Sequence, residues 1–183
     1  EYYKVDKFGR DLGYMFVELV LIQRFILYLG HPMYATAAVI GVMLIFSGVG
    51  SLVSSRLAVT SSLLRKTVAL VAMMIFAYGI IITPLLHQSI ALPALVKAVL
   101  LCLLIAPLAF VMGMPFPLGL RNLSGRHDEG IPWAWGINGC LSVIAAPLAT
   151  LVAVEAGFVV VMVCAAGAYV VAGLSIERTS ILT

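Results

Sequence analysis

Three polar residues interrupt the apolar segment LGYMFVELVLIQRFILYLG, residues 12–30: an acid, Glu18, an amide, Gln23, and a guanidinium, Arg24. A charge near the middle of a bilayer costs at least about 2.5 kcal/mol on insertion scales, so a chain keeps one there only where another group meets it. The six-residue offset between Glu18 and Arg24 corresponds to about 240° around a helix, so the two side chains do not share a face. We therefore expect each to find its partner on another helix, in water or on a ligand.

Asn138 is the leading candidate partner, because it lies inside another apolar segment. Glu18, Gln23, Arg24 and Asn138 together form the predicted intramembrane polar site. Such a site suits a small substrate, a quinone, a lipid headgroup or protons. The alternative is an interhelical clamp in which Arg24 extends its apolar stem and carries its charge outward, and we favour this clamp. Three tyrosines add hydroxyl groups: Tyr14, Tyr34 and Tyr78.

Patterns typical of catalysis or metal binding are absent from the sequence. His31 and His87 fall in turns, where a solvent-facing role is ordinary, so we expect no metal or haem. The sequence has no nucleophile–base set, no CxxC motif and no P-loop, so no catalytic residue and no cofactor is assigned to this chain. Three cysteines lie singly in apolar segments and are predicted to be packing residues: Cys102, Cys140 and Cys164.

The composition is that of an integral membrane protein. The 183 residues are 63% hydrophobic and 10% charged, with a mean hydropathy of +1.14. Soluble domains are about half apolar and about a quarter charged, so the chain lies well outside their range. Its net charge of +3 is too small to predict a nucleic-acid partner.

Six segments are long and apolar enough to cross a membrane, which takes about 20 residues: 12–30, 34–54, 67–86, 94–112, 133–154 and 158–174. We therefore predict an all-α, polytopic membrane protein with a six-helix transmembrane bundle at 12–174. Residues 1–11 are a predicted cytoplasmic lead-in, and residues 175–183 a cytoplasmic tail. Because the sequence begins without Met or a signal region, we expect a further segment to precede it.

Glycine and proline mark the breaks between these segments. Gly30, His31 and Pro32 predict a tight turn, since glycine ends helices and proline cannot continue one. Three further breaks are predicted: a short connection at 83–93, the longest loop at 113–132, and the boundary between the last two segments at 155–157.

The predicted longest loop begins with the motif GMPFPLGLR and ends just before PWAWG. Pro115 and Pro117 cannot continue a helix, and Gly113 permits a tight backbone turn. Arg121 opens the polar part of the loop. The aromatic pair Trp133 and Trp135 follows, where tryptophan typically anchors a helix at the membrane interface.

Small residues predict faces along which neighbouring helices approach closely. They recur in three spans: Ala37, Gly41, Gly48, Ser51 and Ser55 in the second, Gly136, Gly139 and Cys140 in the fifth, and Cys164, Ala168 and Ala172 in the sixth. Such patterns are common in membrane helices, so a compact helical bundle accounts for them.

Basic residues orient the predicted bundle. Nine of the eleven fall on the side of the N-terminus: Lys4, Lys7, Arg10, Arg56, Arg65, Lys66, Arg121, Arg126 and Arg178. The opposite loops hold only Lys97, and Arg24 lies within a span. Cytoplasmic loops are enriched in Lys and Arg, so both ends of the chain are predicted to face the cytoplasm.

Three segments occur in order along the chain: GYMFVELVLIQRFILYLGHPMYATAAVIGVMLIFSGVGSL, GMPFPLGLR and PWAWGINGCLSVIAAPLA. Together they resemble the transmembrane region of bacterial spermidine synthase-like integral membrane proteins, and the resemblance covers nearly the whole chain. In that family, a soluble domain similar to aminopropyltransferases or S-adenosylmethionine-dependent methyltransferases is fused to transmembrane helices.

The resemblance implies a multi-pass protein of the bacterial inner membrane, in which this chain is the anchor or scaffold. Catalytic residues, polyamine chemistry and an S-adenosylmethionine-type ligand would belong to a preceding soluble domain, so none is carried onto this chain. The matching positions include His31, Pro32 and the residues of the two motifs. The resemblance does not assign them a role.

Two alternatives remain open. In the first, the chain is an accessory subunit packed in a larger membrane complex, with its small-residue faces as docking surfaces. In the second, it is a transporter of a small molecule or lipid, although Glu18 is its one membrane-embedded acid and Arg24 would repel a polycation. The expected partners are the lipid bilayer and either other membrane subunits or the soluble domain, and not nucleic acid.

Overall fold

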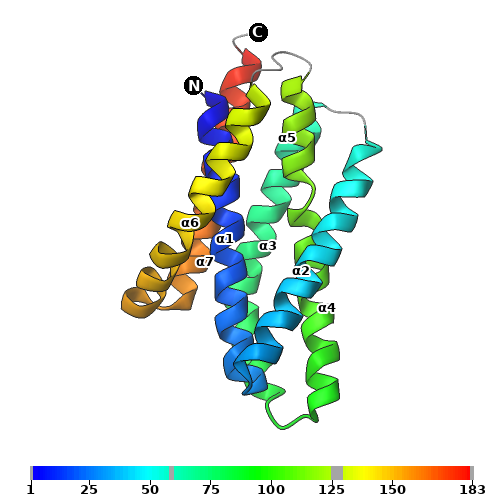
Figure 1. The fold of residues 1–183 in the computed structure, drawn as a ribbon, viewed down its shortest axis with the longest axis vertical. Coiled ribbons are helices and arrows are strands. Elements are labelled where there is room, and N and C mark those ends of the chain that lie inside the picture. The colour runs from blue at the N-terminus through cyan, green and yellow to red at the C-terminus, as the bar shows by residue number, and fades with distance from the viewer. Residues whose placement is uncertain (1, 58–59, 125–129, 182–183) are drawn as a thin grey trace.

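The computed structural model describes residues 2–57, 60–124 and 130–181, and these residues are almost entirely helical. The helices are α1 (Tyr2–Leu29), α2 (Pro32–Ser55), α3 (Ser61–Gln88), α4 (Ala94–Met112), α5 (Pro115–Ser124), α6 (Gly130–Ala156) and α7 (Phe158–Ile181). The long helices run along one axis and form an elongated bundle (Figure 1). No strand occurs among the residues described, so the prediction of an all-α chain is confirmed for them.

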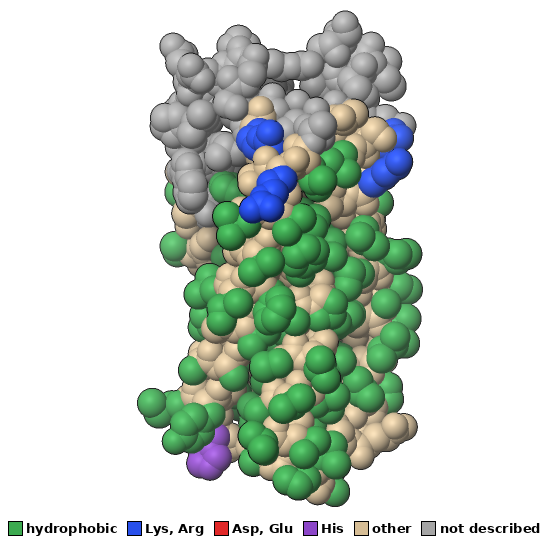
Figure 2. Space-filling model, turned by 90° about the vertical axis from the view of Figure 1, so that its right-hand side faces the viewer, with side chains coloured by type: hydrophobic (Ala, Val, Ile, Leu, Met, Phe, Trp, Pro, Cys, Tyr) green, Lys and Arg blue, Asp and Glu red, His purple; other side chains and the backbone are tan. Residues whose placement is uncertain are grey.

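Most of these helices are long and apolar enough to cross a membrane. Five segments meet that condition: Asp11–Leu29, Pro32–Ser55, Ser62–Gln88, Ala94–Gly119 and Gly139–Ala156. A sixth, Phe158–Leu174, is apolar but shorter. The face shown in Figure 2 is largely hydrophobic along its length, with Lys and Arg near one end and a histidine at the other. The chain therefore has the helices of a multi-pass membrane protein.

The predicted turn at Gly30, His31 and Pro32 is confirmed. Gly30 has a φ of 75° and donates its N–H to the carbonyl of Ile26 at 2.9 Å. His31 is the exposed N-cap residue of α2, and Pro32 is its first residue, where the missing N–H costs no hydrogen bond. The predicted boundary at 155–157 is confirmed in the same way, because Gly157 has a φ of 87°.

Two other predicted connections are wrong in part. Residues 113–132 are not one long loop, because α5 begins at Pro115 and α6 at Gly130. Proline ends a helix that precedes it but suits the first turn of the next, so Pro115 starts a helix here. In the predicted connection 83–93, α3 continues through Pro84 as far as Gln88. Neighbouring groups in a membrane bundle can compensate for the hydrogen bond that such a proline removes.

Helix α1 lies at the centre of the packing and contacts α7, α6 and α2, while α2 packs on α4 and α3 packs on α7. Because α1 has neighbours on several sides, it buries Phe16, Leu21 and Phe25 on different parts of its circumference. The start of α1 and the end of α7 lie at the same end of the bundle (Figure 1). The turn between α6 and α7 lies part-way along the bundle, short of the opposite end (Figure 1).

The predicted small-residue face of α2 is not where the helices approach most closely. A Cβ added at Gly41 or Gly48 would meet no atom within 4 Å, whereas one added at Gly50 would collide with the Phe110 carbonyl of α4. Gly113 makes the reciprocal contact, against the Ser47 backbone. The close approach therefore uses a face adjacent to the predicted one, since spacing alone does not reveal which side a neighbour occupies.

The predicted small-residue faces of the last two spans have different outcomes. In α7, Ala168 and Ala172 do line a close approach, because a Cβ at Gly9 of α1 would meet both residues. In α6, a Cβ added at Gly136 or Gly139 would meet no atom of the described residues within 4 Å. The cysteines predicted to be packing residues are exposed instead: Cys102, Cys140 and Cys164.

Candidate functional site

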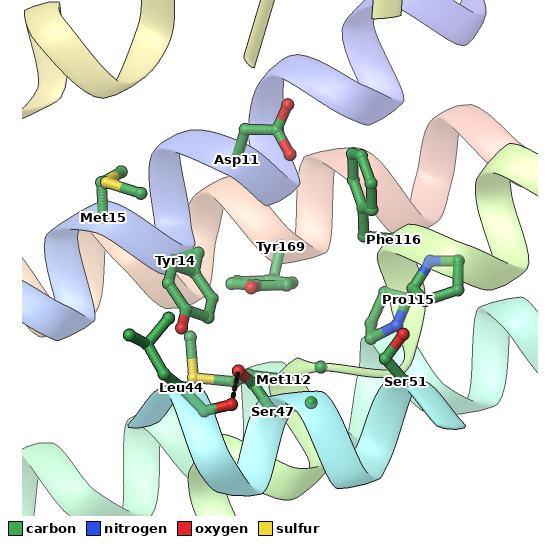
Figure 3. A pocket seen from close by; sticks show the side chains of 13 residues that line it. Asp11, Tyr14, Met15, Leu44, Ser47, Ser51, Met112, Pro115, Phe116 and Tyr169 are labelled. Carbon is green, nitrogen blue, oxygen red and sulfur yellow. Dashed lines mark hydrogen bonds between the residues drawn. The ribbon is translucent and has the colours of Figure 1, made fainter. Parts of the chain in front are cut away.

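A cavity of about 380 Å³ lies where α1, α2, α7 and the break between α4 and α5 meet. We call it the inner cavity, and Figure 3 shows it from close by. Its size is in the range of small-molecule pockets, about 300–1,000 Å³. Thirteen residues line it: Asp11, Tyr14, Met15, Leu44, Ser47, Gly48, Ser51, Met112, Gly113, Pro115, Phe116, Pro117 and Tyr169.

The polar groups of the inner cavity come from three helices. Asp11, which is only 7% exposed, and Tyr14 come from α1, one turn apart. The Tyr14 hydroxyl interacts with Ser47 of α2, and the Ser47 hydroxyl donates to the Leu44 carbonyl at 3.4 Å. Tyr169 of α7 lies between these groups and Phe116 (Figure 3). One acid and several hydroxyls thus face a mostly apolar space, an arrangement that binds and orients a ligand by hydrogen bonds.

The motif GMPFPLGLR forms one wall of this cavity. Gly113 lies directly against the Ser47 backbone, which leaves no room for a side chain there. Gly113 also ends α4, and the break after it lets Pro115 turn the chain into α5. Pro115 is buried and Pro117 is half-buried, and both line the cavity. The glycine and prolines of the motif therefore shape a wall that a continuous helix could not provide.

Arg121, the last residue of the motif, joins α5 to the end of α2. Its Nη1 donates to three backbone carbonyls there: Ser54 at 3.2 Å, Ser55 at 2.9 Å and Leu57 at 3.2 Å. The last four carbonyls of a helix have no partner within the helix, so the guanidinium serves as a cap. Arg121 thereby holds α5, and with it the wall of the inner cavity, against α2.

The predicted polar residues of α1 lie outside the inner cavity. Glu18 and Tyr14 interact electrostatically, because they lie one turn apart on α1. Neither Glu18, Gln23 nor Arg24 lines the inner cavity. The backbone of Asn138 belongs to α6, but its side chain is outside the described part of the structure. The pairing of Glu18 or Arg24 with Asn138 therefore stays a prediction.

Arg24 meets an aromatic ring from another helix. Its guanidinium carbon lies 4.6 Å from the centre of the Phe158 ring of α7. Such a contact is worth about 0.5–1 kcal/mol at exposed sites and about 2 kcal/mol or more where water is excluded. The Nε of Arg24 is nevertheless buried and has no hydrogen-bond partner among the described residues.

Among the other predicted motif residues, His31 makes a packing contact, and the two tryptophans have side chains that the structure does not describe. His31 packs edge-on against Tyr34, with ring centres 5.7 Å apart. The side chains of Trp133 and Trp135 are outside the described part of the structure, although both residues belong to α6. Within the described residues, no group of three or more His, Cys, Asp or Glu side chains is placed to hold a metal ion.

Sequence reasoning does not identify Asp11, Ser47 and Tyr169 as members of one site. Asp11 falls in the predicted polar lead-in because it follows Lys7 and Arg10, yet it begins the apolar part of α1 and is buried. Ser47 is one residue from the predicted small-residue face of α2. The usable signal is an acid one turn before Tyr14, at the start of an apolar segment.

Comparisons with known protein families, with curated proteins and with solved structures find no match for this chain.

Proposed function

We propose that the chain is a membrane anchor and scaffold that crosses the bilayer six times, with both ends on the cytoplasmic side. The observation that carries this proposal is the packing of α1 against α7, with the start of one and the end of the other at the same end of the bundle (Figure 1). A domain attached there would be held by the first and last helices together. Close approach of Gly9 to Ala168 and Ala172 supports such a firm connection.

The charge distribution supports the orientation. Arg56 follows α2, Arg65 and Lys66 are in the first turns of α3, and Arg121 is on α5, at the end of the bundle that also holds the start of α1 (Figure 1). At the opposite end, Lys97 is on α4. An excess of Lys and Arg marks the cytoplasmic side of multi-pass proteins.

Within this proposal, the chain is the membrane block of a spermidine synthase-like protein of the bacterial inner membrane. The support is its resemblance to that family and the distinct tasks of the GMPFPLGLR motif, whose Gly113 allows close packing and whose Arg121 caps α2. Any S-adenosylmethionine-type ligand would be held by a soluble domain at the cytoplasmic end.

The inner cavity is the proposed polar site of the block, in place of the Glu18–Arg24 cluster. Its apolar lining suits the body of an amphiphilic molecule, and Asp11, Tyr14 and Ser51 suit a polar head that donates hydrogen bonds. An amphiphile bound in this cavity would connect the lipid bilayer to the end of the bundle that carries the attached domain.

Two measurements test these proposals. A soluble reporter fused ahead of residue 1 should stay in the membrane fraction after an alkaline carbonate wash, and its release would contradict the anchor. For the cavity, native mass spectrometry of the protein in mild detergent should show a retained small molecule or lipid. Ser51→Leu should reduce its occupancy about tenfold, while the exposed Ser55→Leu, one turn away, leaves it unchanged.

The alternative of an accessory subunit is favoured by a separate observation. Gly41 of α2 and Gly136 and Gly139 of α6 have no described neighbour near them, although small residues usually mark helix contacts. A larger complex would cover them. Stoichiometric partner chains in the native mass spectrum would favour this alternative, and a lone chain would favour the anchor. Substrate uptake that depends on Ser51 would instead favour a transporter.

A further inference from the structure

A second, smaller cavity lies near the opposite end of the bundle, between α1 and α3, and we call it the outer cavity. Its volume is about 130 Å³, well above the roughly 10–15 Å³ that one water molecule needs. It is lined by Arg24, Leu27, Tyr28, Thr83, Leu86, His87 and Ile90. It shares no residue with the inner cavity.

Two buried donors at the outer cavity have no partner. The Nε of Arg24 and the Oγ1 of Thr83 are both buried and form no hydrogen bond with any described residue. Two other threonines of the bundle satisfy their hydroxyls on the preceding turn: Thr67 donates to the Leu63 carbonyl, and Thr150 donates to the Ala146 carbonyl at 3.0 Å. Leaving a buried donor unsatisfied costs about 1–3 kcal/mol, so two beside one cavity indicate an absent acceptor.

The charges around the cavity are positive. Lys97 of α4 lies 5.1 Å from the centre of the Tyr28 ring, and its Nζ donates to the Tyr28 carbonyl at 3.4 Å. Tyr28 is also tied to the α3–α4 connection, because its hydroxyl donates to the Ser89 carbonyl at 3.3 Å. No Asp or Glu is among the residues that line the outer cavity. The wall of the cavity is therefore held in place, and no acid in its lining neutralises Arg24.

The location of the cavity suits a group at the surface of a bilayer. Arg24 lies five residues before the end of α1, or about 7–8 Å along the helix. Phe158, which the guanidinium contacts, is the first residue of α7, so the α6–α7 turn lies at the same level. Leu27 and Ile90, which are 69% and 57% exposed, form an apolar rim on the outside.

We propose that the outer cavity binds a phosphate group, held by the Arg24 guanidinium, the Thr83 hydroxyl and the His87 imidazole. The planar guanidinium matches the oxygens of a phosphate, and its contact with Phe158 fixes its orientation. The phosphate is that of an anionic lipid headgroup or a free inorganic phosphate. The exposed apolar rim provides a surface for acyl chains, as the lipid source requires. The lipid source rests on the proposed membrane placement, whereas binding of the free ion does not.

The test uses the purified full chain in detergent. Thermal unfolding and native mass spectrometry are measured with phosphatidylglycerol, with phosphatidylcholine and with inorganic phosphate. Phosphatidylglycerol should raise the unfolding temperature and remain bound, and Arg24→Met should weaken this binding about tenfold or more, with Thr83→Val giving a smaller loss. Thr67→Val and Thr150→Val are the controls, because neither residue lines the cavity, and both should bind as the parent does.

The outcomes separate the two sources. Binding of phosphatidylglycerol in preference to phosphatidylcholine, lost in Arg24→Met, supports the site with a lipid occupant. Stabilisation by inorganic phosphate alone, with the same dependence on Arg24, supports the site with a free ion. If neither ligand has an effect on the parent protein, the proposal is overturned. Equal ligand effects in the parent, in Thr83→Val and in Arg24→Lys also overturn it, and these two variants keep the test valid if Arg24→Met does not fold. Phosphate binding by a chain whose ends are not cytoplasmic would keep this site and contradict the proposed function.

Discussion

The guanidinium carbon of Arg24 lies 4.6 Å from the centre of the Phe158 ring, so a cation embedded in the first helix is met by an aromatic face at the start of the last one. The contact joins α1 to the α6–α7 turn, where Gly157 adopts a φ of 87°. It also explains how the chain keeps an arginine in an apolar segment without pairing it with Glu18. The aromatic quadrupole supplies part of the electrostatic compensation that an acid would otherwise give.

Replacing Phe158 tests the strength of that contact. Phe158→Leu should destabilise the bundle by about 1–2 kcal/mol, because it removes the ring face but keeps an apolar side chain. Phe158→Tyr keeps the ring and should be close to the parent. The free energy of unfolding, measured by denaturation in mixed detergent micelles, checks this. Equal losses in both variants would contradict an interaction between Arg24 and the ring.

Gly113 should tolerate no side chain. Gly113→Ala places a methyl group against the Ser47 backbone and should cost about 1–3 kcal/mol, since two helix backbones must separate to admit it. Gly41→Ala is the matched control, because a Cβ there meets no atom within 4 Å. It should leave stability unchanged or raise it by up to about 1 kcal/mol through helix propensity. Thermal unfolding of the two variants in detergent distinguishes these effects, and the account is contradicted if Gly41→Ala is the more harmful change.

Arg121 should hold the end of α2 in place. Arg121→Met removes three charge-assisted hydrogen bonds to backbone carbonyls, and because the residue is exposed we expect a loss of about 1 kcal/mol. Arg121→Lys keeps the charge but not the planar geometry and should recover only part of it. Amide hydrogen exchange at the last turn of α2 should accelerate in Arg121→Met. Lys66→Met, an exposed cation on α3, is the control, and equal acceleration there would rule out a capping role.

Much of the fold could be predicted from the sequence, because bilayer-length apolar segments and glycine–proline turns are local signals. The turn at Gly30 and Pro32 is one example: a residue that adopts positive φ and a residue that suits a helix start stand side by side. The beginning of α5 could not be predicted as readily. Pro115 both ends one helix and begins another, and the sequence does not say which role applies.

The candidate site was harder to predict, because it depends on which faces meet. Asp11, Ser47, Gly113 and Tyr169 lie in four separate segments, and each has an ordinary explanation on its own. Gly48 belongs to the face predicted to lie under a neighbouring helix but lines the inner cavity, while Gly50 takes the close contact. Spacing shows that small residues share a face, but it does not show whether a helix, a ligand or lipid covers that face.

Cysteine accessibility in right-side-out membrane vesicles tests the central claim, six crossings with both ends cytoplasmic, most directly. In a variant lacking Cys102, Cys140 and Cys164, single cysteines are placed at residue 1, at His31, at Gly157 and after Thr183, and exposed to a membrane-impermeant maleimide. The account predicts labelling at His31 and Gly157 in intact vesicles, and labelling of the two chain ends only after the vesicles are opened. Labelling of one chain end but not the other in intact vesicles would contradict it.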